Sequence, residues 1–212
     1  MFALMMLVAC SESAPTFTEE DLRTLATHAS DDDFTVPGND VIKGRLDEYT
    51  GPRRAFVEAS LARLAGVEGT IAPAIAAHGL PTELFAVALV ESGFSDIAAN
   101  PPQYPGAGVW QFIPSTARMY GLRVDDTVDE RRDLVKATEA AMQLLGDMYA
   151  VFGDWGLAFA GYNQGHRAVL AAIEAEGTDD PWELIRRGAL NPYAADVMAA
   201  VVVLEQPQAL GF

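Results

Sequence analysis

Apolar residues recur at intervals of three and four along most of this chain, and this spacing is typical of amphipathic helices. The pattern predicts helices over 18–30, 40–49, 56–66, 70–77, 80–92, 114–121, 133–152, 155–162, around 169–173, and from 181 and 192 onward. The segment 133–152 is expected to be the longest of them. No convincing alternation of apolar and polar residues extends beyond a few positions, so the predicted fold class is all-α with many short helices.

The segment 80–92 carries a carboxylate on its apolar face. Leu84, Val87 and Ala88 form one stripe, and Glu91 continues it, because it lies seven residues after Leu84 and four after Val87. Burial and the partial negative charge of a helix C-terminus both disfavour an anion, so the pKa of Glu91 is expected to be raised. Such an acid keeps its proton near neutral pH and can act as a general acid. The alternative is a glutamate on the last turn that points into solvent.

Composition and charge narrow the classes of partner. The chain has 212 residues, of which 50% are hydrophobic, which suits one domain of moderate size with a sizeable core. The net charge of −16 and the lack of a basic cluster argue against nucleic acid as a partner. His28, His78 and His166 share no ligand spacing, and there is a single cysteine. We therefore expect no metal site and no disulfide within the chain.

The first ten residues are typical of a targeting signal. The apolar run 1–9 is too short to span a bilayer, which takes about 20 residues. Leu7-Val8-Ala9-Cys10 resembles the lipobox of bacterial lipoproteins, in which the cysteine is lipidated, and Ser11 implies sorting to the outer membrane. The predicted location is the periplasm of a Gram-negative-type envelope, with a lipid anchor at Cys10. The alternative is a buried N-terminal strand with an ordinary core cysteine.

The chain is expected to divide into three parts. A signal peptide with the lipobox covers 1–10, and a tether with a short helix covers 11–39. The main domain covers 40–212.

Several short motifs in the main domain occur in a fixed order. They are Val90-Glu91-Ser92-Gly93-Phe94, Gly108-Val109-Trp110-Gln111-Phe112-Ile113-Pro114-Ser115-Thr116, Tyr120-Gly121-Leu122, Asp129-Glu130-Arg131-Arg132-Asp133 and Ala160-Gly161-Tyr162-Asn163. The first resembles the catalytic Glu-Ser motif of lytic transglycosylases, and the others resemble later motifs of that family. The resemblance extends back to Tyr49-Thr50-Gly51 and Arg53-Arg54 and covers about 40–204. It is closest to the membrane-bound lytic murein transglycosylase D type.

This resemblance implies a lysozyme-like fold of many short helices around a glycan-binding cleft. It also implies cleavage of peptidoglycan between N-acetylmuramic acid and N-acetylglucosamine, with a 1,6-anhydro product and no cofactor. Glu91 would be the single general acid and base. The acetamido group of the substrate can shelter the oxocarbenium-like centre, so a second catalytic carboxylate is unnecessary. Asp96 is accordingly expected to be a turn or capping residue.

The resemblance further implies a set of substrate-binding residues, namely Ser92, Trp110, Gln111, Tyr162, Asn163 and Tyr193. Ser92 would orient Glu91 or a sugar hydroxyl, and the amides of Gln111 and Asn163 suit acetamido and hydroxyl groups. Tyr162 and Trp110 have aromatic faces suited to sugar rings or to core packing, and the sequence leaves this choice open. Tyr193 is the candidate for a tyrosine that contacts the acetamido group, although Ala189-Leu190 replaces the usual Glu-Thr before it.

Two other functions remain open at this stage. A muramidase of the same fold would use water and leave a reducing end. A non-catalytic peptidoglycan-binding lipoprotein would result if changes in the loop 100–108, which lacks the usual serine before Gly-Ala, had damaged the cleft. In each case the expected partners are glycan strands and, through Cys10, a membrane, and the protein is expected to be a monomer.

Overall fold

Helices make up all the regular secondary structure in residues 18–27 and 34–212, the part of the chain that the computed structural model describes. They are α1 (Glu19–Thr27), α2 (Asp40–Thr50), α3 (Arg54–Ala77), η1 (Thr82–Leu84), α4 (Phe85–Ser92), α5 (Pro114–Met119), η2 (Glu130–Arg132), α6 (Leu134–Phe152), α7 (Trp155–Gln164), α8 (His166–Glu176), α9 (Pro181–Arg186) and α10 (Tyr193–Glu205). The all-α prediction is confirmed for these residues. The expected signal peptide and Cys10 lie outside them.

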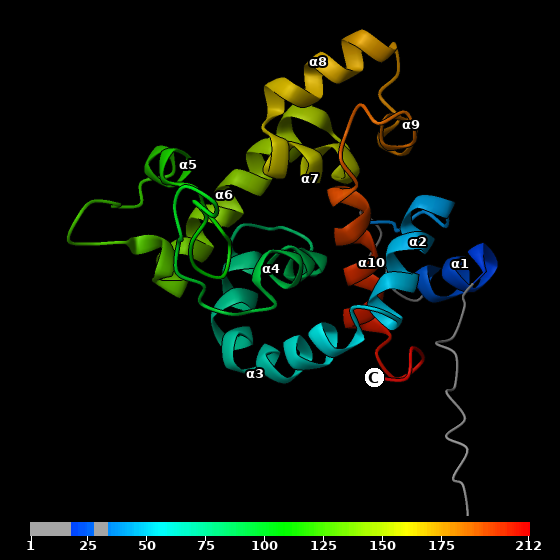
Figure 1. Ribbon diagram of the computed structural model, residues 1–212, viewed down its shortest axis with the longest axis horizontal. Helices are drawn as coiled ribbons and strands as arrows, with labels where there is room; N and C mark the ends of the chain where they lie inside the picture. Colours follow the sequence, from blue (N-terminus) through cyan, green and yellow to red (C-terminus); the bar gives the residue numbers. More distant parts are fainter. Residues whose placement is uncertain (1–17, 28–33) are drawn as a thin grey trace, which may run out of the picture.

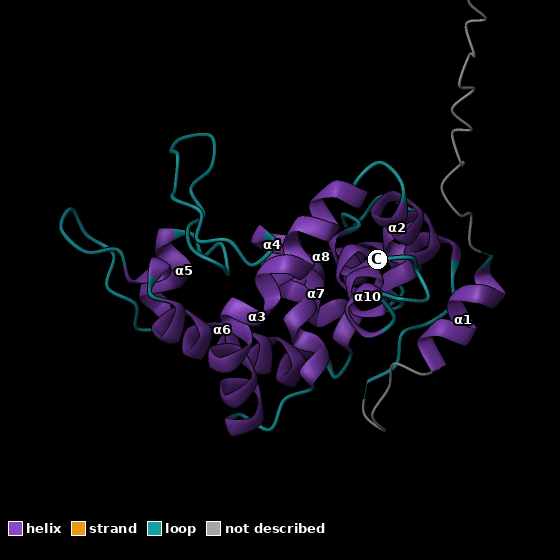
Figure 2. Ribbon diagram, turned by 90° about the horizontal axis from the view of Figure 1, so that it is seen from below, coloured by secondary structure: helices purple, strands orange, loops and turns teal. Residues whose placement is uncertain are grey.

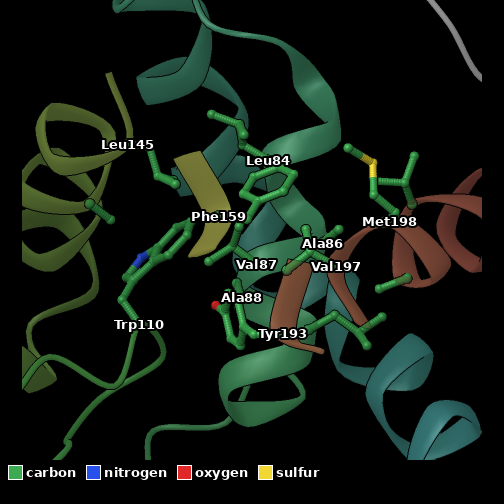
Figure 3. Close-up of a cluster of buried hydrophobic side chains, with 14 of the residues drawn as sticks. Leu84, Ala86, Val87, Ala88, Trp110, Leu145, Phe159, Tyr193, Val197 and Met198 are labelled. Atoms are coloured by element: carbon green, nitrogen blue, oxygen red, sulfur yellow. The ribbon is translucent and has the colours of Figure 1, made fainter. Parts of the chain in front are cut away.

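The short helix α4 lies near the centre of the arrangement, with α3, α6, α7 and α10 around it (Figure 1). Ala86, Val87, Ala88 and Leu89 are fully buried. Figure 3 shows Trp110 on one side of this helix and Tyr193 on another. Because α4 is packed on several sides, the position of its C-terminal end, which carries Glu91, is fixed by the core.

The structure corrects the prediction of two helices over 56–66 and 70–77. Both belong to α3, which runs without a break for 24 residues and is longer than α6 with 19. Two glycines and Pro73 lie inside α3 and lower its intrinsic stability. Val67, Ile71 and Ile75 are nevertheless buried against the core. Their burial outweighs the local preference for a break, a tertiary effect that a local pattern does not show.

Residues before position 40 also contribute to the core. Leu22 on α1 is fully buried, and Phe34 and Val36 are almost so. The ring of Phe34 lies 5.9 Å from that of Trp155, centroid to centroid. The described part of 11–39 is therefore packed against the main domain.

Polar side chains fix the starts of several helices. Asp133 accepts a hydrogen bond from the backbone N–H of Lys136 at the start of α6. Asp154 caps α7 in the same way, through the N–H of Leu157. These caps matter for the site because α6 and α7 form walls of the cleft described below.

The long loops that flank α5 lie at the end of the molecule opposite α1 (Figures 1 and 2). One of them, 93–113, links α4 to α5 and contains the second sequence motif. Among the described residues, none of the helices has the length and apolar character needed to cross a bilayer.

Candidate active site

Glu91 occupies the last turn of α4, where this helix leaves the core. The helix ends because Gly93 adopts a left-handed conformation (φ 57°), and its N–H donates to the carbonyl oxygen of Leu89 at 2.8 Å. Glu91 is half-buried and lines a cleft of about 770 Å³. A carboxyl group therefore stands at the boundary between the core and the cleft.

Tyr193, the first residue of α10, holds this carboxyl group. Its hydroxyl donates a hydrogen bond to Oε1 of Glu91 at 2.6 Å. Burial raises the pKa of Glu91 from its ordinary 4.5 to about 7, and the bond from Tyr193 acts in the opposite direction. Burial and the charge of Glu91 raise the pKa of Tyr193 well above 10, so its phenol stays protonated and donates. The raised pKa of Glu91 expected from the sequence is confirmed, with burial as the main cause.

The contact with Glu91 gives Tyr193 a partner that the sequence did not predict. Tyr193 is only 8% exposed, and the cleft is lined by other residues. Its place at the start of α10 directs the hydroxyl to Glu91. The hydrogen bond to the carboxyl group of Glu91 uses the phenolic proton of Tyr193, and the contact with a substrate acetamido group stays a prediction.

Tyr162 on α7 connects Tyr193 to the second motif. The two rings are stacked, with centroids 6.3 Å apart and an interplanar angle of 10°. The Tyr162 hydroxyl donates to the backbone carbonyl oxygen of Trp110 at 2.7 Å. Burial and the charge of Glu91 raise the pKa of Tyr162 well above 10, so it also remains a donor. Tyr162 lines the cleft beside Glu91, which is one of the two positions that the sequence left open for it.

The loop from Gly106 to Phe112 forms another part of the cleft wall, with an unusual backbone. Gly108 has φ 76°, and a Cβ at this position would lie 1.8 Å from the carbonyl oxygen of Arg131. Gln111 also has a positive φ of 50°, and its Nε2 donates to the carbonyl oxygen of Gly108 at 2.6 Å. Strained backbone of this kind is common at functional sites. Gln111 lines the cleft, with its amide nitrogen bound to its own loop.

Ser92 supports this loop instead of facing the cleft. Its side chain is buried, and its hydroxyl donates to the carbonyl oxygen of Val109 at 2.8 Å. The hydroxyl oxygen of Ser92 also accepts a hydrogen bond from the backbone N–H of Ser95 at 3.2 Å. Ser92 therefore links the end of α4 to the second motif, and its expected role in orienting Glu91 or a sugar hydroxyl stays a prediction.

Trp110 packs mainly in the core. The sequence left open whether its ring packs there or faces a sugar ring in the cleft. Trp110 is fully buried, and its Nε1 donates to Oγ1 of Thr138 on α6 at 3.0 Å. Figure 3 shows its ring packed on the same side of α4 as Leu145 and Phe159. Trp110 is also among the residues that border the cleft. The buried indole thus fixes the loop on α6 and leaves Gln111 at the surface.

Asn163 is exposed at the end of α7 and lines the cleft. Its Oδ1 accepts a hydrogen bond from Nδ2 of Asn191 at 2.8 Å. Asn191 in turn accepts one from the backbone N–H of Tyr193 at 3.1 Å. Asn191 therefore joins Asn163 to the start of α10, a link between residues 28 positions apart that no local sequence pattern indicates.

The far wall of the cleft contains residues to which the sequence analysis gave no function. The Tyr120 hydroxyl donates to Oδ2 of Asp147 on α6 at 2.9 Å, and burial together with Asp147 raises the pKa of Tyr120 to about 12. Ile113, Met119 and Val151 expose 43%, 77% and 51% of their surfaces along this wall. Asp147 and Val151 are one helical turn apart, a spacing that could have shown that they share a face of α6.

Asp96 pairs at the surface with Arg132, with the closest atoms 2.6 Å apart. It does not line the cleft. In residues 18–27 and 34–212, no three histidine, cysteine, aspartate or glutamate side chains lie together in a way that could hold a metal ion.

Comparison of the sequence with known proteins assigns the chain to a family. The model of the transglycosylase SLT domain matches residues 70–185, which contain Glu91, Gln111 and Asn163. The chain is 32% identical over 181 residues to membrane-bound lytic murein transglycosylase D of Escherichia coli K12, and equally to the protein of that name from E. coli O6:H1 strain CFT073. These alignments cover 83% of this chain but 39% of each relative, so the chain spans about two fifths of their length. The family model and the order of the motifs agree, and the chain belongs to the transglycosylase SLT domain family.

Proposed function

We propose that this chain is a lytic transglycosylase that acts on the glycan strands of peptidoglycan. It would cleave the bond between N-acetylmuramic acid and N-acetylglucosamine without water and leave a 1,6-anhydro end. The observation that carries the proposal is a half-buried Glu91 at a cleft, with a pKa of about 7 and a bond from Tyr193 to one of its oxygens. Such a group can both give and take a proton near neutral pH.

The proposed reaction uses Glu91 twice. Its proton moves to the glycosidic oxygen, the bond from that oxygen to C1 of the muramic acid residue breaks, and the N-acetylglucosamine end leaves as an alcohol. The C6 hydroxyl of the muramic acid residue then attacks C1, and its proton returns to the Glu91 carboxylate. Tyr193 holds Oε1 throughout, which leaves Oε2 to exchange the proton. The acetamido group of the substrate stabilises the positive charge at C1.

The distribution of carboxylates around the cleft supports a mechanism with one acid. Among the described residues that line it, the other carboxylate is Asp147, which lies on α6 and accepts the hydroxyl of Tyr120. Asp96 is paired with Arg132 and lies outside the lining. An inverting hydrolase would need a second carboxylate to activate water.

The chemical identity of the product tests this proposal. Purified peptidoglycan sacculi digested with the protein should release fragments that end in an anhydro sugar, because no water enters the reaction. Mass spectrometry of the fragments distinguishes the outcomes. Fragments that are heavier by one water would show a muramidase, and binding to sacculi without any release would show a non-catalytic lipoprotein. Either result would overturn the proposal.

We also propose that the chain is held at the outer membrane, on its periplasmic side, by a lipid on Cys10. The support is the apolar run before Cys10 and the polar segment after it. A lipid chain adds membrane affinity in proportion to its buried CH₂ groups, so its loss should weaken membrane binding. Cys10→Ala is therefore expected to move the full-length protein out of the membrane fraction after cell fractionation, with Ser13→Ala as the matched control. Retention of the Cys10→Ala variant in the membrane fraction would contradict the anchor.

A further inference from the structure

A cluster of charged residues lies behind Tyr193, away from the cleft. Asp196 on α10 is three residues after Tyr193, and its side chain is 13% exposed. Arg45 on α2 donates to both of its oxygens, from Nε to Oδ1 at 3.0 Å and from Nη2 to Oδ2 at 3.3 Å. The Tyr49 hydroxyl reaches Oδ1 at 3.5 Å, and Nη1 of Arg53 lies 3.6 Å from the same atom.

This cluster accounts for Tyr49 and Arg53 of the motifs Tyr49-Thr50-Gly51 and Arg53-Arg54, which the proposed function leaves unused. Tyr49 is fully buried, and the guanidinium of Arg53 lies over its ring at 4.7 Å from the centroid. None of these residues lines the cleft. Their shared partner is Asp196, so both residues serve the contact between α2 and α10.

The chemistry of the cluster makes this contact specific. Burial raises the pKa of Asp196, and Arg45 and Arg53 oppose that effect. A buried carboxylate needs such partners, and removing them leaves an uncompensated charge. Arg45 also pairs with Glu48, so it keeps one acid if Asp196 is changed. The bidentate contact with Arg45 sets the rotation of the first turn of α10 as well as its distance from α2.

The first turn of α10 is also the turn that carries Tyr193. Residues three apart on a helix lie on nearly the same face, so a rotation that moves Asp196 also moves Tyr193. The hydroxyl of Tyr193 has to stay 2.6 Å from Glu91 to make its bond. We propose that Asp196, held by Arg45, Tyr49 and Arg53, is a positioning residue that sets the contact between Tyr193 and the carboxyl group of Glu91. The expected effect on catalysis rests on the proposed function.

The proposal predicts a change in the protonation of Glu91. The titratable groups that face Glu91 are Tyr193 from α10 and Tyr162 from α7, and both phenols stay protonated. The bond from Tyr193 favours the ionised form of Glu91, so its loss raises the pKa of Glu91. A general acid must be protonated to act, and activity falls as the pH rises through its pKa. A higher pKa therefore moves the basic limb of the pH profile of kcat/KM to higher pH.

Asp196→Asn is the direct test, because it keeps the shape of the side chain and removes its charge. We expect kcat to fall about tenfold with KM changed less than about twofold, since the acid is misplaced while the cleft is intact. The basic limb should move upward by no more than about one to two pH units, the size expected for the loss of one hydrogen bond to a charged group. Tyr193→Phe should move it in the same direction. In the Tyr193→Phe background, Asp196→Asn should add no further shift.

A titration that needs no turnover separates this inference from the proposed function. The full chain with ¹³C-labelled glutamate side chains can be titrated by NMR, with the Glu91 signal assigned by its loss in Glu91→Gln. The pKa of Glu91 should rise in both Tyr193→Phe and Asp196→Asn, even if no glycan is cleaved. If it rises in Tyr193→Phe and stays unchanged in Asp196→Asn, Asp196 has only a structural role and the inference is wrong.

Two further variants serve as a control and as a replacement for Asp196→Asn. Asp40→Asn removes a different ion pair between α2 and another helix, that of Asp40 with Arg186 on α9, and should leave the pKa of Glu91 unchanged. Tyr49→Phe removes one hydroxyl from the cluster and keeps the packing, so it replaces Asp196→Asn if that variant does not fold. It should give a smaller shift in the same direction, and no shift in a folded Tyr49→Phe protein would then overturn the proposal.

Discussion

Glu91→Gln is expected to abolish measurable cleavage of peptidoglycan, with a loss of at least about 10³-fold in kcat. A positioned general acid or base contributes about 10²–10⁴-fold, and the proposed reaction uses Glu91 in both roles. Glutamine has nearly the same shape, and its amide oxygen can still accept the hydroxyl of Tyr193. The cleft and its glycan affinity should therefore be kept, so the loss should appear in kcat and not in binding to sacculi.

The same variant should change stability in a way that depends on pH. Because the pKa of Glu91 is about 7 in the folded protein and ordinarily 4.5, the folded chain binds the proton more tightly than the unfolded chain. Stability therefore falls as the pH rises from 4.5 to about 7. Glutamine has no proton to lose, so the variant should be more stable than the wild type by about 2–3 kcal/mol at about pH 8 and little different at about pH 4. Urea unfolding at the two pH values measures this difference.

The cleavage assay and the urea unfolding of Glu91→Gln together show whether the variant has lost its catalytic acid or its fold. An inactive Glu91→Gln protein that is more stable at high pH has lost only its acid. Asp96→Asn is the matched control, because it removes the other carboxylate between Glu91 and the second motif and should keep activity. Full activity of Glu91→Gln would refute the role of Glu91.

Local sequence patterns were sufficient to predict the parts of the site that lie within one helix or one loop. The spacing of Leu84, Val87 and Glu91 predicted a carboxyl group on the buried face of a short helix, and the structure has it there. Motif order likewise indicated that Gln111 and Asn163 would share a cleft with Glu91, and both line it. In these cases a short-range pattern and the long-range packing require the same arrangement.

Contacts between distant segments were the part that the sequence did not reveal. Arg45 and Asp196 are 151 residues apart, and no local pattern pairs them. The hydroxyl of Ser92 has its partner in Val109, in a loop whose path depends on Trp110. The continuity of α3 similarly depends on burial that only the assembled core supplies.

Arg131 is the residue for which we expect the largest loss of stability. Its side chain is 4% exposed and binds Asp129 through Nε and Nη2, both at 2.7 Å. Its Nη1 donates at 2.7 Å to the carbonyl oxygen of Pro105, just before the loop that carries Gln111, and at 3.0 Å to that of Phe112, the last residue of the loop. Arg131→Met keeps the length of the side chain and removes every donor. Four acceptor oxygens would then each lose a hydrogen bond, at a cost of about 3–5 kcal/mol.

The neighbouring Arg132 provides the control for this prediction. It pairs with Asp96 at the surface, where both side chains are about half exposed (47% and 46%), and such pairs contribute little because water and salt screen them. Arg132→Met should therefore unfold in urea almost like the wild type, whereas Arg131→Met should unfold at a much lower concentration. Arg131→Met should also lose activity under conditions where it is still folded, because the loop that places Gln111 is no longer held. Equal losses of stability in the two variants would show that Arg131 acts only as a surface charge, and the loop would then have to be fixed by Ser92 and Trp110 alone.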